Sequence, residues 1–293
     1  MLLLRTLGST ELRQADGESR AVPLEPKRFA LLVYLALGRA GNPIPRDTLL
    51  ALFWPELDEQ AARSALRQAL HYLATRLGAD KILGRGTNEI GIDHQHLRCD
   101  VLEFDAALDA NESARALRVF SGEFLPGFLF GQASREFLGW IDGERSRLTE
   151  RALDAALLLV DEEERLGNVT GQIHWLKRAL DLEPFREDLL ERIVVLYEGE
   201  GNRGTAAQAI RAFARTLRSR YGVSISPTTR QHLRRLQRDL VAGPDREISF
   251  QRFHALQEQV SAEMSRTTEL MRQLQALTRQ RTNGSTQESE RVT

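Results

Sequence analysis

The sequence has almost no cysteine and no long apolar run. Cys99 is the single cysteine of 293 residues, so the chain cannot form an internal disulfide or present a pair of thiolates to a metal ion. No run reaches the roughly 18 apolar residues of a membrane-spanning helix. The run Leu2 to Leu4 is too short for a signal peptide and lacks a basic leader. We therefore expect Cys99 to be buried filler and the protein to be cytoplasmic, without membrane contact.

An excess of charge is also missing. The chain has 40 Lys and Arg and 41 Asp and Glu residues, for a formal net charge of -1 at pH 7. Any affinity for nucleic acid must therefore come from a local cluster of basic side chains. With 42% hydrophobic and 28% charged residues, the composition is that of a globular protein, and the length suits two ordinary domains.

Motifs for catalysis are absent as well. The sequence shows no nucleophile beside a base, no metal-ligand spacing and no phosphate loop. His94 and His96 lie two residues apart in a predicted strand, but without cysteines or a third ligand nearby we interpret them as surface histidines. Gly84-Arg85-Gly86 is not followed by a helix start, so it is no dinucleotide fingerprint. We expect neither an enzyme nor a cofactor or metal site.

The clearest pattern that is present predicts an amphipathic helix over residues 59–77. Its apolar positions recur every three or four residues, at Ala62, Leu66, Ala69/Leu70, Leu73 and Leu77. Asp58 and Glu59 suit the N-terminal end of a helix dipole, and Gly78 suits the C-terminal end. Successive turns of the opposite side carry polar groups, of which arginine and glutamine can contact base edges. These are Arg63, Ser64, Arg67, Gln68 and His71.

A short hairpin is predicted after this helix, between Lys81 and Asp93. Gly86, Thr87 and Asn88 supply its turn, with Arg85 near the tip. A helix followed by a basic hairpin is typical of a winged helix. Taken alone, however, an exposed face with three basic side chains is more often plain solvated surface, so the neighbouring elements must decide.

The elements expected before residue 59 complete an α+β domain. Residues 2–24 predict a small antiparallel sheet of two or three strands, with a turn at 15–17. A helix is expected from Pro26 to Gly38 or Gly41, and a second one from Arg46 to Phe53, stopped by Pro55.

This order of segments resembles the winged-helix DNA-binding domain of response regulators (OmpR/PhoB type), in the version carried by SARP-type bacterial transcriptional activators. The matching segments are PLEPKRFALLVYLAL, IPRDTLLALFWPELD, ARSALRQALHYLATRLG and RGTNEIGI. The resemblance implies that the helix enters the major groove of double-stranded DNA, while Arg85, Thr87 and Asn88 touch backbone or minor groove. The helix has Tyr72 to Thr75 where the family commonly has arginines, and the wing lacks a glycine-tyrosine pair. Both departures imply weaker DNA binding by a monomer.

Helical patterns dominate from residue 100. Helices are expected after Asp100, over 113–121 and from Ser134 to Gly167, with the apolar loop 123–128 tucked into the core. Gly167-Asn168 and Gly201-Asn202 lie 34 residues apart, and residues 179–184 read A-L-x-L-x-P, which is the spacing of a tetratricopeptide repeat (TPR). Another helix is expected over 205–221. Stacked repeats would leave a concave groove for partners.

Residues 100–240 also resemble the bacterial transcriptional activation domain. The segments that carry this resemblance are CDVLEFDAALDA, GEFLPGF, LDLEPFREDLLERIVVLYEGEGNRGTAAQAIRAFARTL and YGVSISPTTRQHLRRLQ. It implies contact with RNA polymerase or with neighbouring protomers. Residues 241–281 then place apolar residues at most heptad a and d positions, which predicts a helix that either forms a homo-oligomer or folds back onto the repeats. The polar residues 282–293 are expected to be disordered.

We therefore predict a mainly α protein. Residues 1–99 form a winged helix-turn-helix, 100–240 an all-α TPR-like domain, 241–281 a coiled-coil-like helix and 282–293 a tail. The predicted function is a sequence-specific transcription regulator that activates from promoter direct repeats. The alternative is a helical-repeat adaptor for protein interactions whose winged helix no longer binds DNA. The predicted DNA contacts are Arg63, Ser64, Arg67, Gln68, His71, Arg85, Thr87 and Asn88.

Overall fold

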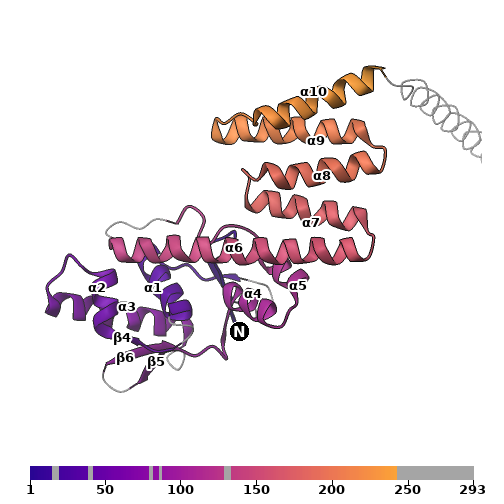
Figure 1. The fold of residues 1–293 in the computed structure, drawn as a ribbon. Coiled ribbons are helices and arrows are strands. Elements are labelled where there is room, and N and C mark those ends of the chain that lie inside the picture. The colour runs from indigo at the N-terminus through magenta and orange to yellow at the C-terminus, as the bar shows by residue number, and fades with distance from the viewer. Residues whose placement is uncertain (15–19, 39–41, 79–81, 86–87, 129–132, 243–293) are drawn as a thin grey trace, which may run out of the picture. The chain divides into compact units, whose positions relative to one another are not determined.

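The computed structural model describes residues 1–14, 20–38, 42–78, 82–85, 88–128 and 133–242. These residues form mainly helices with two small sheets (Figure 1). They divide into two compact units, one of residues 1–196 and one from Tyr197 onward, which are described separately. No helix of the described residues is both long and apolar enough to cross a membrane.

The N-terminal sheet has four strands, in the order β3-β2-β1-β7. Strands β1 (Leu2–Arg5), β2 (Glu11–Gln14) and β3 (Arg20–Ala21) pair antiparallel, as the sequence predicts. Strand β7 (Leu97–Cys99) adds to β1 in parallel, which was not predicted. His94 and His96 lie in a turn before β7, so the prediction that they occupy a strand is wrong.

Three helices and a second sheet follow the predicted order. Helices α1 (Pro26–Leu37), α2 (Arg46–Phe53) and α3 (Glu59–Leu77) match the predicted segments. Strands β4 (Ile44–Pro45), β5 (Ile82–Arg85) and β6 (Glu89–Ile92) form an antiparallel sheet in the order β4-β6-β5, so the hairpin is confirmed.

Helix α3 begins and ends for the expected physical reasons. The Asp58 carboxylate accepts a hydrogen bond of 2.8 Å from the Ala61 amide, and so pairs an amide that the first turn leaves open. Gly78 ends the helix at a φ of 109°, which favours glycine. The buried face is the predicted stripe of Ala62, Leu66, Ala69, Leu73 and Leu77. Burial of this stripe leaves the opposite face to solvent.

The same unit continues with α4 (Asp100–Asp109), α5 (Ser113–Val119) and α6 (Arg135–Arg165). Near the start of α6, the ring of Phe137 lies 4.8 Å from that of Phe53 in α2, measured between centroids. Phe124 and Leu125 are buried, which confirms the prediction that the apolar loop enters the core. Since α2 and α6 share an aromatic core, the expected domain boundary near residues 97–100 falls inside one compact unit.

Two glycine turns of the same kind occur in the next part of the chain. Helix α7 (Val169–Leu182) packs against α6, and α8 (Glu187–Gly199) follows it. Gly167 before α7 has a φ of 67°, and Gly201 after α8 has a φ of 74°. These left-handed turns lie at the two positions from which the sequence predicts a 34-residue repeat.

The unit from Tyr197 onward contains α9 and α10 packed against each other. Helix α9 (Arg203–Thr216) starts two residues before the predicted one, and the last turn of that prediction is a π-helix, η3 (Leu217–Tyr221). Helix α10 (Pro227–Ala242) ends the described chain. The predicted tail, and all of the predicted heptad helix except its first two residues, lie outside the described residues.

Cys99 is buried at the end of β7, as expected of filler, and this makes its thiol a reporter of unfolding. Only 1% of the residue is exposed, and burial raises the pKa of the thiol to about 12. At pH 8 the reactive thiolate is therefore about one part in 10,000. We expect Cys99 to resist an aromatic disulfide reagent in the folded chain and to react fully in denaturant, as followed by absorbance. Labelling of the folded chain at the rate of free cysteine would contradict this.

Candidate nucleic-acid interface

The exposed face of α3 brings together most of the predicted DNA contacts. Arg63, Arg67, Gln68 and His71 are exposed on successive turns, and Ser64 is half-buried between them. Within the described residues, the side chains of Arg67, Gln68 and His71 make no hydrogen bond or ion pair. These three polar side chains are not needed to hold this fold together, so they are free to contact a ligand.

Arg63 is held by two carboxylates. Its Nη2 lies 2.6 Å from Oε1 of Glu59, one turn earlier in α3, and 3.8 Å from Oδ1 of Asp47 in α2. All three side chains are more than half exposed. Exposed pairs of this kind contribute well under about 1 kcal/mol, so a phosphate could displace them. Asp47 is a negative group beside the predicted interface that the sequence analysis missed.

The hairpin is tied to the start of α2. The amide of Arg46 donates a hydrogen bond of 2.8 Å to the carbonyl oxygen of Asn88, and the Asn88 side chain is exposed. Strand β5 also contacts α3, so the hairpin and α3 are held in fixed relation. Arg85 ends β5 opposite Glu89. The side chain of Arg85 lies outside the described part of the structure. Thr87, another predicted contact, lies outside the described residues.

Two further arginines, Arg28 from α1 and Arg76 from α3 itself, lie beside the ring of Tyr72 in the second half of α3. The guanidinium of Arg28, from α1, lies 4.0 Å from the ring centre of Tyr72, and that of Arg76 lies 5.3 Å from it. Arg28 also pairs with Glu25 at 2.8 Å. The ring of Tyr72 thus contacts two guanidinium groups, in the part of α3 where residues 72–75 include no arginine. Arg28 was missed because it comes from a different helix.

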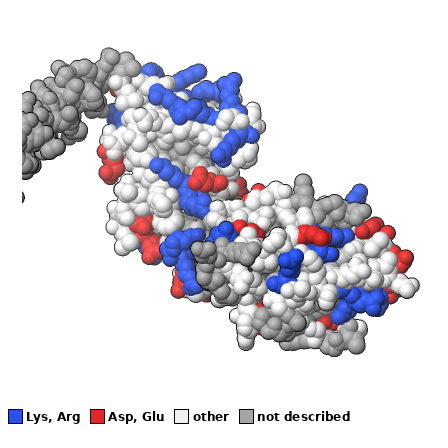
Figure 2. Space-filling model, turned by 180° about the vertical axis from the view of Figure 1, so that it is seen from behind, with Lys and Arg blue, Asp and Glu red and all other residues white. Residues whose placement is uncertain are grey.

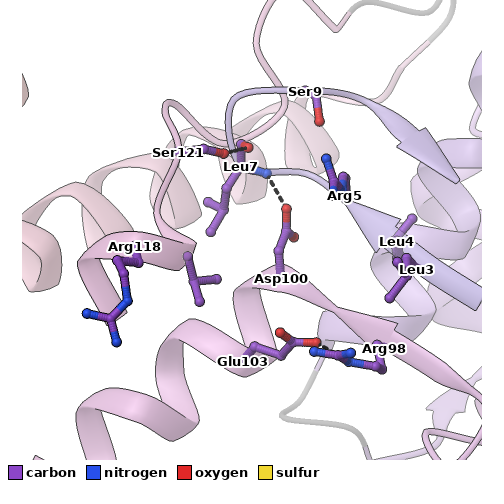
Figure 3. Close-up of a pocket in the computed structure, with 11 residues that line it drawn as sticks. Leu3, Leu4, Arg5, Leu7, Ser9, Arg98, Asp100, Glu103, Arg118 and Ser121 are labelled. Atoms are coloured by element: carbon purple, nitrogen blue, oxygen red, sulfur yellow. Dashed lines mark hydrogen bonds and ion pairs between the residues drawn. The ribbon is translucent and has the colours of Figure 1, made fainter. Parts of the chain in front are cut away.

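A second group of charged side chains lines a cavity of about 400 Å³ beside β1, α4 and α5 (Figure 3). The Nε–H of Arg98 donates a hydrogen bond of 2.5 Å to the Glu103 carboxylate, so these two opposite charges pair with each other. Asp100 points to the segment after β1, where its carboxylate accepts bonds from the amides of Thr6 and Leu7 at 2.7 and 2.8 Å. The central acid of this cavity therefore joins two parts of the fold, and its bonding capacity is largely used within the protein.

The comparisons with known proteins cover most of the chain. Residues 94–240 match the family described as bacterial transcriptional activator domain. The structure of Mycobacterium tuberculosis EmbR in complex with a low affinity phosphopeptide is similar at a TM-score of 0.51 and 22% identity. This similarity covers 81% of the present chain and 65% of the EmbR chain, and at this identity it shows the fold alone. No curated protein matches the sequence.

Proposed function

The chain belongs to the bacterial transcriptional activator domain family, and from this premise we propose that it regulates transcription by binding specific DNA sequences through residues 1–99. In this proposal residues 1–99 are a winged helix-turn-helix, with α3 as the recognition helix and the β5–β6 hairpin as the wing. The TPR-like residues 100–240 contact RNA polymerase or a second protomer. Two protomers then occupy direct repeats in a promoter.

The exposed row on α3 is the observation that carries the proposal. Arg67, Gln68 and His71 lie on consecutive turns and have no partner among the described residues. A single helix fits the major groove of B-DNA, where arginine pairs with guanine and glutamine with adenine. Burial of the opposite face fixes α3 in the domain, so its outer side chains are presented on a rigid support.

The adaptor alternative draws on one observation of its own. Arg63 is engaged by Glu59 and Asp47, so part of the positive charge of α3 is neutralised within the protein. A surface with this mixture of charges also suits a protein partner. Only the transcription regulator requires binding to duplex DNA, so a measurement of DNA binding distinguishes the two functions.

Selection from a random-sequence pool tests the proposal. The full chain is used to enrich duplexes of about 30 base pairs, or three helical turns, and binding to an enriched duplex is measured by fluorescence anisotropy. We expect Arg67→Ala to weaken this binding and to reduce the slope of log K against log salt by about 1. Asp47→Asn should strengthen it, since a negative charge near the phosphates is removed.

Arg115→Ala is the matched control, because Arg115 is an exposed arginine of α5 paired with Glu112. It should leave the affinity unchanged. Failure to enrich any sequence, or equal binding by the Arg67→Ala and wild-type chains, would reject α3 as the recognition helix and favour the adaptor.

A further inference from the structure

The near-zero net charge conceals a strong separation of charge along the chain. Residues 100–196 contain 20 carboxylates and 11 basic residues, whereas residues 197–242 contain nine arginines, no lysine and three carboxylates. The last described helices are therefore strongly basic. Figure 2 shows Lys and Arg side chains gathered over the unit that carries α9 and α10.

All nine of these arginines are exposed, and most lack a charge partner. Arg235 pairs with Glu198 at 2.9 Å, and Arg230 donates to the carbonyl oxygen of Ile225. The other seven form no ion pair with any described residue. They are Arg203, Arg211, Arg215, Arg218, Arg220, Arg234 and Arg238.

The arginines form rows on the outer sides of two packed helices. Arg211, Arg215 and Arg218 are spaced by four and three residues, which places them one above another along α9 and η3. Arg230, Arg234 and Arg238 repeat this every four residues on α10. The buried side chains of these elements, such as Phe213, Leu217 and Leu236, occupy other positions of each turn. We call the two rows together the arginine face.

We propose that the arginine face is a second DNA-contacting surface, which binds the phosphate backbone of duplex DNA without recognising its sequence. This rests on the proposed function, to which it adds a separate binding site. Arginine suits phosphate because its planar guanidinium donates two parallel hydrogen bonds. Two helices side by side, each about 10 Å wide, exceed the roughly 12 Å major groove. The face therefore lies against the backbone.

Other anionic partners fit the face less well. Insertion into a membrane needs exposed apolar side chains, and among the described residues of this unit only Tyr221 and Val223 are large, apolar and exposed. A second copy of the chain could offer the acidic residues 100–196. Many carboxylates there already pair with arginines of the same segment, as Asp105 does with Arg147 and Arg151. Duplex DNA offers one unpaired charge per about 1.7 Å.

The test measures salt dependence with the full chain. The ligand is a labelled duplex of mixed sequence, about 40 base pairs long, titrated by anisotropy between about 0.05 and 0.2 M salt. We expect the triple variant Arg211→Gln/Arg215→Gln/Arg218→Gln to reduce the slope of log K against log salt by about 2 to 3, at about 0.9 for each lost phosphate contact. The corresponding triple lysine variant keeps the charges and should keep the slope.

The matched control removes the same charge elsewhere. Arg115→Gln/Arg186→Gln/Arg192→Gln changes three solvent-accessible arginines that pair with carboxylates, and should leave the slope unchanged. Equal slopes for the triple glutamine variant of the face and for wild type overturn the proposal. If that variant also loses self-association in sedimentation, the face is a contact between copies. Failure of the α3 proposal gives a different result. In that case Arg67→Ala binds the enriched duplex as wild type does, while the triple glutamine variant of the arginine face still lowers the slope.

Discussion

Replacement of Phe137 by alanine is expected to lower the free energy of unfolding of the residue 1–196 unit by about 3 to 5 kcal/mol. The side chain is fully buried near the start of α6. Its ring centroid lies 4.8 Å from that of Phe53, 5.5 Å from Trp140 and 6.0 Å from Tyr34. The rings come from three helices whose backbones cannot all move inward, so truncation leaves a cavity. Urea unfolding followed by circular dichroism measures the loss.

The adjacent residue provides the control. Leu138 is 40% exposed, so Leu138→Ala should change stability by only about 0.5 kcal/mol or less. An unfolding midpoint for Phe137→Ala equal to that of Leu138→Ala would show that α6 does not stabilise α1 and α2. The same cluster explains why DNA binding is best tested on the full chain. A fragment of residues 1–99 would expose Phe53, which α6 covers.

Elements with local signals could be predicted from the sequence. Helix α3 was bounded correctly because its apolar period, its N-terminal Asp58 and its C-terminal Gly78 all lie within 21 residues. Helix α6 was predicted for the same reason, with Ser134 accepting a hydrogen bond from the amide of Phe137 at its start. In both helices the residues that set these ends directly adjoin the helix in the sequence.

Features that depend on distant segments were missed. Strand β7 pairs with β1 across more than 90 residues, and a three-residue strand carries no pattern that reveals its partner. The π-helix at Leu217–Tyr221 has only one buried side chain, Leu217, so apolar periodicity could not distinguish it from the last turn of an α-helix.

The candidate interface shows the same division. Exposure of Arg67 and Gln68 followed from the helical period of α3 alone. The ion pair between Arg63 and Asp47 could not be predicted in this way, because Asp47 belongs to α2 and approaches Arg63 only after the two helices pack. Arg28 beside Tyr72 is a similar case from α1. Charge added or cancelled by a neighbouring helix has no signature in the sequence of α3.

Removal of the Asp100 carboxylate should be the second strongly destabilising change. Asp100 is the first residue of α4, and its carboxylate accepts bonds from the amides of Thr6 and Leu7 and from the Thr6 hydroxyl. Asp100→Ala leaves both amides without this partner in a largely buried setting, and each costs about 1 to 3 kcal/mol. We expect a total of about 3 kcal/mol in urea unfolding. Asp109→Ala, at a carboxylate that is 74% exposed, should cost under about 1 kcal/mol.

The pH dependence of stability gives Asp100 a separate signature. Burial raises the pKa of its carboxyl above the ordinary 3.8, although hydrogen bonds from Leu7 and Thr6 oppose the shift. The folded state therefore holds the proton more tightly than the unfolded state does. This contribution to stability is complete below pH 3.8 and is lost as the pH rises through the raised pKa. Asp100→Asn cannot titrate, so the stability of wild type relative to this variant should fall over that window. A rise instead would mean that the hydrogen bonds to the ionised carboxylate outweigh its burial.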